Sequence, residues 1–579
     1  MSRNPITPDI ILRNRLNALS PDKQALLRLR LNQKQTTGNQ AIIDALLASG
    51  ITHIYSLCGE PIQETLATAA RAGIRVIGTH HQQAAVMMAV AQNYSAGRTC
   101  AAVIVSAGPA VTNISTGLLI AKDNAWPVVV LGGKHTPSRE IVGQFQELDG
   151  AILYRPITKW SGCITETADI SATINNAFHI ASTGRPGPVY LDITEDVLNS
   201  RFEDSNAVKR AVLTTLPARP ELKKLEQIAS LIRTARRPAL IIGKGTRWHT
   251  DITVLQQLVW QQKIAFITSP MGRGILPDDH ALCFNPIRSK LQDAADVVLV
   301  LGARLDWTFR HGSQINPDAR VIHVDIDPEE VNQNNKVTDG ITADTGFFLT
   351  GLAELLTSPP DSQTLSGRND WHRALAEERN KREQFIRDTV TLPGLPMSPF
   401  RLMHELKQTL PDDTILVVDG KTSMMAAQQV IPANTPFSRL TPGSNGCIGS
   451  GVPFGIGAAM QNPTRPVVVI SSDTGFGMSG MELETAVRYK LSLIVVVINN
   501  DGISGTNLQR TLFADAEDPI ATFQPGIRYD QLARSLGAEG LFVDRPEQID
   551  AAMKKALSTG KSTCINVIVA PDAQYISEL

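Results

Sequence analysis

Cysteine is scarce in this sequence: its 579 residues include six cysteines, and no two of them stand at CxxC spacing. A disulfide framework or a zinc site needs cysteines at short, regular spacing, so neither is favoured. Scattered thiols of this kind are typical of proteins in a reducing compartment. We therefore expect a cytoplasmic protein whose cysteines are reduced.

Net charge and long apolar runs are also lacking. The chain has 55 Lys and Arg residues against 56 Asp and Glu residues, a formal net charge of -1. This balance supplies no field that would attract nucleic acid or an anionic membrane. No apolar run approaches the roughly 18 residues that a membrane span needs, and the opening MSRNPITPDI lacks the apolar core of a signal peptide. We expect a soluble protein with neither kind of partner.

The length of the chain predicts several domains, because a single core rarely serves more than about 300 residues. Short apolar strands alternate with helices in three successive blocks, which is typical of α/β domains with doubly wound parallel sheets. The predicted divisions are an N-terminal helical extension at 1–37, α/β domains at 38–197, 198–356 and 396–579, and a linker with a charged helix at 357–395.

The predicted strands are continuous apolar runs, as in parallel sheets that are covered on both faces. In the first block we predict strands at 54–57, 75–78, 101–106 and 128–132, and helices at 40–49, 63–72 and from 82 onward. Strands of the second block are predicted at 239–243, 265–268, 297–301 and 321–325. The third block has a predicted strand at 415–418 and two more in the stretch discussed below.

The N-terminal extension has a helix start at Ser20, which a proline and an acid follow. One interpretation is an amphipathic helix that packs back onto the same chain. The other rests on the stretch LSPDKQALLRLRL, which resembles linker segments of nonribosomal peptide synthetases. That resemblance would indicate a pathway of carrier proteins.

A glycine turn, Gly243-Lys244-Gly245, follows one predicted strand. Such a turn at the start of a helix would hold a phosphate. The sequence lacks the full GxGxxG pattern, so a plain strand-to-helix turn is favoured and phosphate binding is the alternative.

The stretch VISSDTGFGMSGMELETAVRYKLSLIVVVINNDGISG is the most informative part of the chain. It predicts a strand that stops at Asp473, a loop of small residues, a helix at about 481–489 and a strand at 494–498 followed by Asn500. The carboxyl ends of parallel strands lie at one edge of the sheet, where ligands bind. Asp473, Asn500 and the carbonyl of Gly502 offer three hard oxygens there, which suit Mg²⁺ and leave positions for diphosphate oxygens. The alternative is that the Asp and the Asn only cap the elements that follow them.

The order of an Asp, a helical crossover and an Asn-Asn pair resembles the metal-diphosphate motif of thiamine diphosphate enzymes. Here Ser472-Asp473-Thr474 stands where the family usually has Gly-Asp-Gly or Gly-Asp-Ser. The wider resemblance is to the acetolactate synthase and decarboxylase group, closest to 2-hydroxyacyl-CoA lyase and oxalyl-CoA decarboxylase. The stretches that carry it are AWPVVVLGG at 125–133, FQELD at 145–149, GRPGPVYLDI at 184–193, MGRGILPDDH at 271–280, LGARLDW at 301–307 and VDIDPEE at 324–330.

This resemblance implies a pyrimidine-binding, a central Rossmann-like and a diphosphate-binding domain, with thiamine diphosphate and Mg²⁺ as cofactors. In the family, a large apolar side chain at the position of Ile448 supports the bent cofactor, and the carbonyl of Gly446 accepts its aminopyrimidine N–H. The cofactor-binding residues that the resemblance implies are Thr422, Ser423, Gly446, Ile448, Asp473, Thr474, Gly475 and Asn500. The implied metal ligands are Asp473, Asn500 and Gly502.

One departure concerns the catalytic motif of the first domain. The family motif Arg-His-Glu-Gln supplies a glutamate that hydrogen-bonds N1′ of the aminopyrimidine, whereas this chain has His80-His81-Gln82-Gln83. A carboxamide still hydrogen-bonds N1′ but does not exchange a proton at neutral pH. The resemblance places His81 and Gln82 in the active site, and we expect Gln82 to tune the reaction rather than to end it.

Two further side chains are candidates for the same site. Glu60, in CGEP, is the nearest carboxylate by sequence, because it lies on a strand-to-helix loop that lines the active site in the family. Buried beside a cofactor, it would have a raised pKa and would exchange protons near neutrality. The alternative is that Glu60 caps the following helix. Gln146 matches a substrate-side glutamine of the lyase, which favours lyase-type over oxalyl-type substrates.

We expect a carbon-carbon lyase or carboligase that acts on a 2-hydroxyacyl or 2-oxoacyl substrate. The sequence closes with PDAQYISEL, where CoA-handling relatives continue with a tail over the coenzyme, so a free acid, an aldehyde or a carrier-bound thioester is an alternative to a CoA thioester. Because Gln82 replaces the family glutamate, a catalytically weak relative that serves as a binding or scaffold subunit is a second hypothesis. A flavin-bearing relative is a third, although no feature demands a flavin.

The resemblance also implies a homo-oligomer, either a dimer or a tetramer. In this group the cofactor lies between the first domain of one subunit and the third domain of another. We therefore expect Gln82 and Asp473 to face each other across a dimer interface. Met87 and Met88 would fit an apolar surface at that interface, although burial within one subunit explains them equally well.

Overall fold

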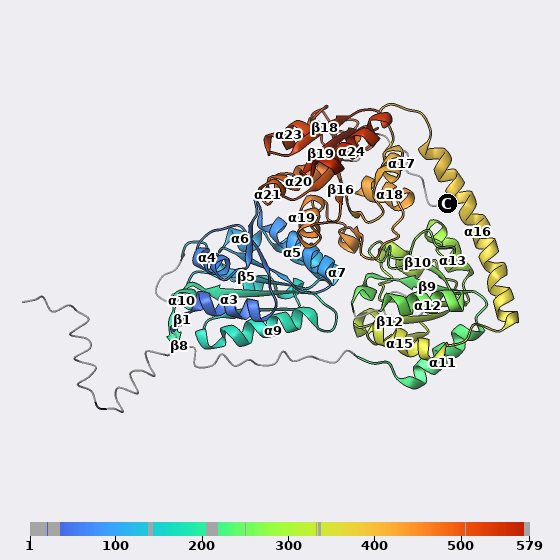
Figure 1. Cartoon of the computed structure of the whole chain (residues 1–579), viewed down its shortest axis with the longest axis horizontal. Coiled ribbons are helices and arrows are strands. Elements are labelled where there is room, and N and C mark those ends of the chain that lie inside the picture. Colours follow the sequence, from blue (N-terminus) through green and yellow to red (C-terminus); the bar gives the residue numbers. More distant parts are fainter. Residues whose placement is uncertain are drawn as a thin grey trace, which may run out of the picture.

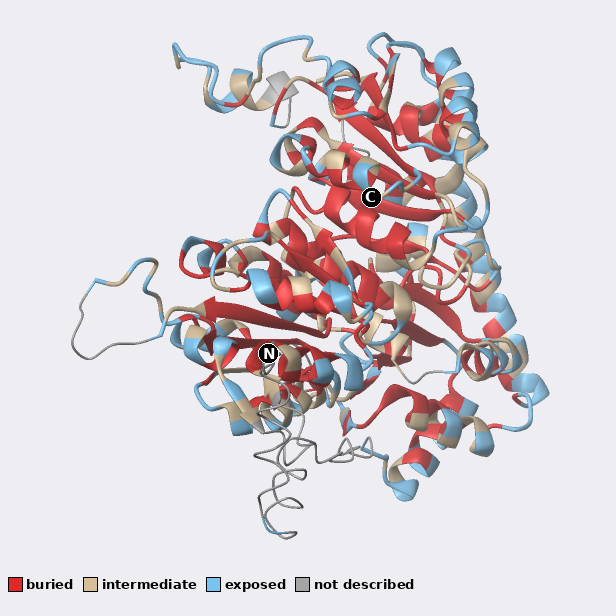
Figure 2. Ribbon diagram, turned by 60° about the vertical axis from the view of Figure 1, so that its left-hand side comes forward, coloured by how far each residue is buried: buried red, intermediate tan, exposed pale blue. Residues whose placement is uncertain are grey.

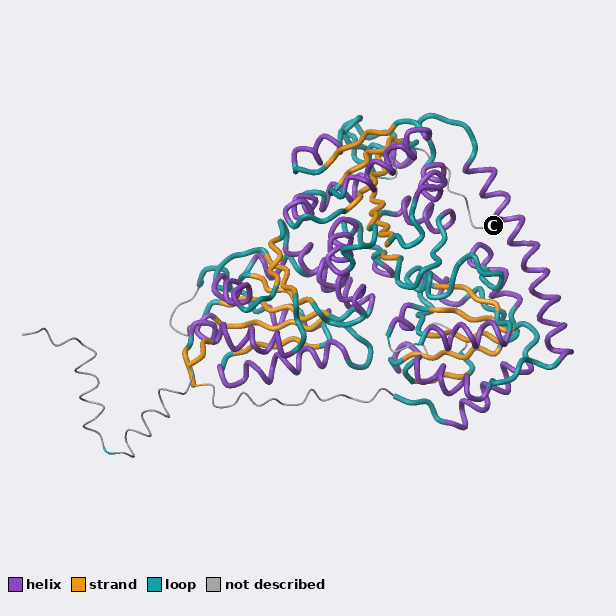
Figure 3. Tube along the Cα trace, viewed as in Figure 1, coloured by secondary structure: helices purple, strands orange, loops and turns teal. Residues whose placement is uncertain are grey.

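The computed structural model describes residue 20 and residues 35–136, 143–203, 218–248, 251–331, 333, 337–503 and 505–571. These residues form three lobes, which follow one another in colour along the chain in Figure 1. In each lobe a parallel sheet lies between helices (Figure 3). The predicted fold class, three doubly wound α/β domains, is confirmed. The predicted N-terminal helix lies outside the described residues, apart from Ser20 itself.

The first domain has a six-stranded parallel sheet. Its strands, in spatial order, are β3 (Arg75–Gly78), β2 (His53–Ser56), β4 (Ala101–Val105), β5 (Val128–Lys134), β7 (Pro188–Thr194) and β6 (Trp160–Ile164). Its helices are α3 (Gly38–Ala48), α4 (Gln63–Arg71), α5 (Gln82–Ala96), α6 (Pro109–Thr112), α7 (Ser115–Asn124), α8 (Gly150–Leu153), α9 (Ile170–Ser182) and α10 (Glu195–Asn199). Strands β1 (Gln35–Thr37) and β8 (Arg201–Glu203) pair antiparallel beside it. Every residue of β4 is buried, as its continuous apolar run predicts. Every residue of β7 is also buried, although the sequence analysis did not predict this strand.

The central domain has a five-stranded parallel sheet. Its strands, in spatial order, are β10 (Ala265–Thr268), β9 (Pro238–Ile242), β11 (Val297–Leu301), β12 (Arg320–Asp325) and β13 (Asp339–Thr342). Its helices are α11 (Leu222–Thr234), α12 (Ile252–Gln262), α13 (Arg288–Ala294), α14 (Pro328–Val331) and α15 (Thr345–Leu355). Figure 2 shows the strands as a buried layer beneath helices whose outer faces are exposed.

The third domain has a six-stranded parallel sheet. Its strands, in spatial order, are β15 (Arg439–Leu440), β14 (Ile415–Asp419), β16 (Val467–Ser472), β17 (Leu493–Asn499), β19 (Thr563–Ile568) and β18 (Glu539–Val543). Its helices are α17 (Pro399–Thr409), α18 (Lys421–Val430), α19 (Gly451–Gln461), α20 (Asp473–Ser479), α21 (Glu482–Arg488), α22 (Gly505–Leu512), α23 (Tyr529–Ser535) and α24 (Ile549–Thr559).

Helix α16 (Ser362–Val390) connects the central and third domains and runs along the outside of both in Figure 1. Trp371 and Leu375, in its first half, belong to the core of the central domain. Ile386 and Val390, near its end, belong to the core of the third domain. The charged helix predicted in this linker is therefore present and longer than expected. Within the described ranges, no helix is both long and apolar enough to cross a membrane.

The first and third domains contact each other through α5 and α19. A Cβ atom added to Gly457 of α19 would lie 2.2 Å from the carbonyl oxygen of Met88 in α5, so the close approach of the two helices requires glycine. Met87 and Met88 are fully buried in the apolar cluster that the two domains share. Burial within the chain therefore explains these two methionines, and neither supplies an exposed surface for a subunit interface.

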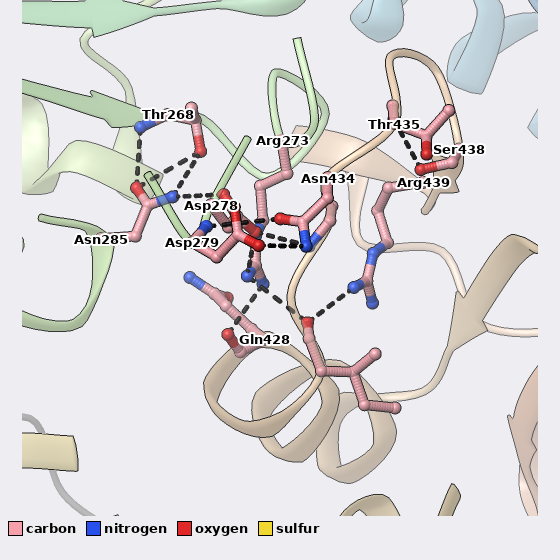
Figure 4. A network of polar contacts seen from close by, with 12 residues as sticks. Thr268, Arg273, Asp278, Asp279, Asn285, Gln428, Asn434, Thr435, Ser438 and Arg439 are labelled. Atoms are coloured by element: carbon pink, nitrogen blue, oxygen red, sulfur yellow. Dashed lines mark hydrogen bonds and ion pairs between the residues drawn. The ribbon is translucent and has the colours of Figure 1, made fainter. Parts of the chain in front are cut away.

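The central and third domains meet at a buried ion pair, shown in Figure 4. Arg273 donates from Nε and Nη2 to Oδ2 of Asp278 at 2.8 and 2.5 Å, and the two side chains are 8% and 5% exposed. The Arg273 Nη1 group also donates to the carbonyl of Gln428 in α18, at 2.7 Å. Asp278 in turn accepts the backbone N–H of Ala433 and the side-chain N–H of Asn285, each at 2.8 Å. One ion pair thus satisfies polar groups of both domains.

We expect Arg273→Ala to lower the free energy of unfolding by about 3–5 kcal/mol, because Asp278 would remain as a buried and unpaired charge. Urea unfolding followed by tryptophan fluorescence measures the change. Arg387→Ala is the control, because the Arg387–Glu383 pair on α16 is largely exposed and should change stability by less than about 1 kcal/mol. Equal losses in the two variants would contradict the assigned role of the buried pair.

Candidate active site

Polar side chains follow three adjacent strands of the third sheet where these strands end. Strand β14 ends at Asp419, β16 is followed directly by Asp473, and β17 is followed directly by Asn500. The three strands are parallel neighbours, so these residues lie at one edge of the sheet. The structure therefore brings Asp473 and Asn500 together, at the kind of edge that the sequence predicted for them.

The Asp473 carboxylate joins the two loops that carry the predicted metal ligands. Its Oδ2 atom accepts the backbone N–H groups of Asn500 at 3.3 Å and Gly502 at 3.0 Å, and its Oδ1 atom accepts that of Thr474 at 2.6 Å. Burial raises the pKa of Asp473 to about 6, although these hydrogen bonds act in the opposite direction. A divalent cation at this position would favour the ionised carboxylate.

The segment after Asp473 differs from the prediction. We expected a loop of small residues, but the structure has helix α20 over Asp473–Ser479. Ser472 caps this helix by accepting the N–H of Gly475 at 3.0 Å. Gly475 must be small, because a Cβ atom there would lie 2.7 Å from Oδ2 of Asp419. Gly475, one of the small residues that suggested a loop, therefore serves close packing inside a capped helix.

Asp419 was missed by the sequence analysis. It is fully buried, and its Oδ2 atom accepts the backbone N–H groups of Gly449 and Gly451, each at 3.0 Å. Burial raises the pKa of Asp419 to about 6 against the effect of these bonds. The two glycines follow Gly446 and Ile448, so Asp419 anchors the loop that carries both predicted cofactor contacts. An acid at the end of the apolar run ILVV was the available signal.

The two predicted cofactor residues of that loop, Gly446 and Ile448, are only partly covered by the rest of the chain. Ile448 is half-buried and lies between the short 3₁₀ turn Gly443–Asn445 and helix α19. Gly446 is exposed, with φ at 67°, and a Cβ atom there would meet no heavy atom within 4 Å. Ile448 is thus not the fully buried core residue that its apolar side chain would suggest.

Helix α18 begins beside the same edge. Its N-cap, Gly420, has φ at 94°, and a Cβ atom there would lie 2.6 Å from the Ser472 hydroxyl oxygen. Thr422 is half-buried and Ser423 is fully buried, both in the first turn. The hydroxyl of Ser423 has no hydrogen-bond partner among the described residues. A buried, unpartnered donor at the start of a helix fits the binding of a diphosphate.

The composition of the site also fits a particular class of metal. In the described part of the chain, no three His, Cys, Asp or Glu side chains are grouped as a metal site. The predicted site needs one carboxylate, from Asp473, one amide, from Asn500, and one carbonyl, from Gly502. Such a sparse oxygen set suits Mg²⁺, which keeps several positions for phosphate oxygens and water.

In the first domain, Gln82 is the first residue of α5 and is buried. Its Oε1 atom accepts an N–H of the Asn113 side chain at 3.0 Å. Asn113 follows α6, which comes after β4, and sequence reasoning missed it. His81 is exposed and caps α5, because its Nδ1 atom accepts the N–H of Gln83 at 3.1 Å. The structure thus gives His81 a role in starting the helix that carries Gln82.

The two remaining predicted residues are more exposed. Glu60 is exposed in the turn before α4, and the N-cap of that helix is Ile62, without a side-chain capping bond. The capping alternative for Glu60 is therefore wrong, and the chain by itself does not bury this carboxylate. Gln146 is half-buried, with φ at 54°, and packs against Gly108, where a Cβ atom would lie 2.6 Å from the Gln146 Cβ atom. Gly108 precedes α6, so Gln146 lies on the same side of the domain as Asn113.

A separate cavity of about 270 Å³ lies between the first and central domains, and Asn124 and Lys244 are among the residues that line it. Lys244 Nζ donates to the carbonyl of Asp123 and to Oδ1 of Asn124, each at 2.9 Å, and burial lowers the pKa of Lys244. Strand β9 is followed by a 3₁₀ turn, Lys244–Arg247, rather than by an α-helix start. This favours the interpretation of Gly243-Lys244-Gly245 as a plain turn.

Comparisons with known proteins give the chain a family. Three family models match: the N-terminal TPP binding domain of thiamine pyrophosphate enzymes at 36–153, the central domain at 225–352 and the C-terminal TPP binding domain at 419–567. The chain is 31% identical over 563 residues to 2-hydroxyacyl-CoA lyase 1 of Homo sapiens, which covers 94% of this chain and 96% of the relative. The chain belongs to the thiamine pyrophosphate enzymes. Thiamine diphosphate is accordingly its family cofactor.

Other relatives of this thiamine pyrophosphate enzyme have related activities. A 2-hydroxyacyl-CoA lyase of Arabidopsis thaliana is 30% identical over 552 residues, which cover 93% of this chain and 96% of the relative. An oxalyl-CoA decarboxylase of Escherichia coli strain K12 is 30% identical over 554 residues, which cover 93% of this chain and 96% of the relative. The resemblance noted from the sequence is thus confirmed, and it supports lyase or decarboxylase chemistry in general.

We expect the apparent affinity for thiamine diphosphate with Mg²⁺ to fall as the pH drops through about 6. The predicted metal site needs the ionised Asp473 carboxylate, whose pKa burial raises to about 6, so each pH unit below it should cost up to about tenfold in affinity for one displaced proton. Calorimetry between pH 5 and 8, on the order of one titration per half unit, measures the slope. Asp473→Ala should bind thiamine diphosphate with Mg²⁺ weakly at every pH, and the slope of its log affinity against pH should be smaller by one proton. An unchanged slope in that variant would contradict the metal assignment.

Proposed function

We propose that this thiamine pyrophosphate enzyme is a Mg²⁺-dependent carbon-carbon lyase or carboligase that acts on 2-hydroxyacyl or 2-oxoacyl substrates. The observation that carries the proposal is the edge of the third sheet, where Asp473 binds the backbone of Asn500 and Gly502 beside the unpartnered hydroxyl of Ser423. The names of the relatives, 2-hydroxyacyl-CoA lyase and oxalyl-CoA decarboxylase, support the substrate class.

Each part of the edge has a role in this proposal. When bound, thiamine diphosphate supplies a nucleophilic ring carbon and an electron sink for the carbon-carbon bond that breaks. Asp473, Asn500 and the carbonyl of Gly502 would hold Mg²⁺ against the diphosphate. The first turn of α18, with Thr422 and Ser423, would donate hydrogen bonds to the diphosphate, as would Thr474 and Gly475 at the start of α20. Ile448 and Gly446 would contact the rings from the anchored loop.

Gln82 would act on the aminopyrimidine through a fixed hydrogen bond. Its Oε1 atom is engaged by Asn113, so its Nε2 group remains as the donor toward the cofactor nitrogen. A donor stabilises the unprotonated form of that nitrogen, and an amide carries no proton between the cofactor and water at neutral pH. Gln146, next to the exposed Phe145, would contact the substrate acyl group.

A second candidate function is that of a binding or scaffold subunit with weak activity. It is favoured by the absence of a carboxylate at Gln82 together with the exposure of Glu60, the residue expected to replace it. The buried acids of the third domain do not separate the two candidates, because a scaffold subunit that retains its cofactor would keep them. Activity measurements on the holoprotein distinguish the two functions.

We expect holoprotein to consume one of three substrate classes: free 2-oxoacids, 2-hydroxyacyl-CoA thioesters or thioesters on an acyl carrier protein. Mass spectrometry of the products, and of the cofactor after acid quenching, identifies the class and the carrier. Asp473→Ala is the control and should be inactive with every class, because it lacks the metal carboxylate. Turnover by protein from which thiamine diphosphate and Mg²⁺ have been removed would contradict the proposed function.

We expect Gln82→Glu to raise the rate at which the C2 proton of the bound cofactor exchanges with solvent. A carboxyl group at this position adds acid-base catalysis, which typically contributes about 10²–10⁴ in rate. Proton NMR of the cofactor, after timed dilution into D₂O and acid quenching, measures the exchange. Glu60→Gln should leave it unchanged, since Glu60 is exposed. If Gln82→Glu has no effect and wild type consumes no substrate, the scaffold function replaces the enzymatic one.

A further inference from the structure

Helix α21 of the third domain contacts the backbone that leads into Gln82. Glu482 Oε1 accepts the backbone N–H groups of His80 at 2.9 Å and His81 at 3.0 Å, and its Oε2 atom accepts the hydroxyl of Thr485 at 2.7 Å. Glu482 is only 2% exposed. Three donors thus replace water around this buried carboxylate, and two of them belong to the first domain.

Two more side chains at the end of α21 extend this contact. The Tyr489 hydroxyl accepts the N–H of Gly78 at 2.7 Å and donates to the carbonyl of Val76 at 3.2 Å. Arg488 Nη2 donates to the carbonyl of Gly78 at 2.9 Å. The segment from Val76 to His81 is therefore anchored at five backbone groups by side chains of one helix and its C-cap.

The anchored segment ends where α5 begins. His81 is the N-cap of α5, so Gln82 follows the two N–H groups that Glu482 binds. On the other side, Glu482 stands at the start of α21, which follows α20 after a corner at Gly480. A Cβ atom at Gly480 would lie 2.6 Å from the carbonyl oxygen of Phe476, so this corner is tight. Glu482 is thus carried by a short and closely packed piece of the third domain.

We propose that Glu482 is a positioning residue for Gln82: by holding the backbone N–H groups of His80 and His81, it fixes the start of α5. The proposal rests on the proposed function, in which Gln82 donates to the cofactor. A carboxamide acts there only through the geometry of its hydrogen bond, whereas a carboxylate also acts through its charge. The placement of the backbone at His80 and His81 therefore has a larger effect in this chain than it would with a glutamate at position 82.

The test uses Glu482→Ala, which removes the acceptor, and Glu482→Gln, which retains it. In the glutamine variant, Oε1 still accepts the two backbone N–H groups and Nε2 donates to the Thr485 hydroxyl. The matched control is Asp344→Ala in the central domain. Asp344 is also a buried carboxylate that accepts two backbone N–H groups, from Gly346 at 2.9 Å and Phe347 at 3.2 Å.

Hydrogen exchange of residues 76–83 in the protein without cofactor is the first readout. We expect Glu482→Ala to reduce amide protection there at least about tenfold, Glu482→Gln to restore most of it, and Asp344→Ala to leave it unchanged. Because no cofactor is present, this measurement tests the anchor independently of the proposed function. Unchanged protection in Glu482→Ala would overturn the proposal.

Exchange of the cofactor C2 proton in the holoprotein is the second readout. We expect Glu482→Ala to slow it up to about 10²-fold, as misplacement of a catalytic group by about 1 Å does, and to slow it no further in a Gln82→Ala background. An equal additional loss in that background, or a glutamine variant as slow as the alanine variant, would overturn the positioning role. If Glu482→Ala does not fold, Thr485→Val, which removes only the hydroxyl on Oε2, should give the same non-additive pattern with a smaller loss. Failure of wild type to bind thiamine diphosphate with Mg²⁺ would instead overturn the proposed function.

Discussion

The close crossing of α5 and α19 at Gly457 determines how the first and third domains fit together within one chain. Each helix begins beside residues predicted for the active site: α5 begins with Gln82, and α19 begins after the loop that holds Ile448. Because the bodies of the two helices share one apolar cluster, a shift of either helix would move a site element at its start. The Gly457 contact, at the backbone of Met88, leaves little room for such a shift.

Buried carboxylates define the electrostatics of this region. Asp419, Asp473 and Glu482 each accept backbone N–H groups, and burial raises the pKa of all three. Backbone dipoles compensate a buried anion less completely than a cation does, so the ionised forms are disfavoured while no cation is near. A divalent cation beside Asp473 would relieve this cost at the point where the negative charge of a diphosphate also needs compensation.

Sequence patterns predicted most of the interior strands and the choice of strand ends. Runs such as VVLVL at 297–301 are buried on both faces, and the predicted strand there coincides with β11. The edge strands β6, β13, β15 and β18 were not predicted, because they are partly exposed or only two residues long and so lack a continuous apolar run. The buried strand β7 was missed as well, because Asp192 interrupts its apolar run. Helix α20 was missed because its glycines suggest a loop, and the close packing of Gly475 against Asp419 is not visible in the sequence.

The candidate site likewise contains residues that the sequence could predict and residues that it could not. Asp473 and Asn500 were predictable, because strand order alone places the ends of β16 and β17 at one edge. Asp419 had a local signal, as an acid at the end of an apolar run, but its bond to Gly449, 30 positions further on, had none. Asn113 and Glu482 were not predictable, because each acts by a hydrogen bond to a residue more than 30 positions away in the chain. No local pattern encodes such a pair. The exposure of Glu60 was equally inaccessible, since CGEP is compatible with either a buried or an open turn.

Helix α16 has a mechanical consequence for the molecule. An α-helix of 29 residues is about 43 Å long, and this one is embedded in two different cores, through Trp371 in its first half and Val390 at its last residue. The central domain therefore cannot rotate away from the third domain unless the helix bends or one of its apolar side chains leaves a core. Any motion that opens the candidate site is thus restricted to displacements that keep these two domains together as one unit.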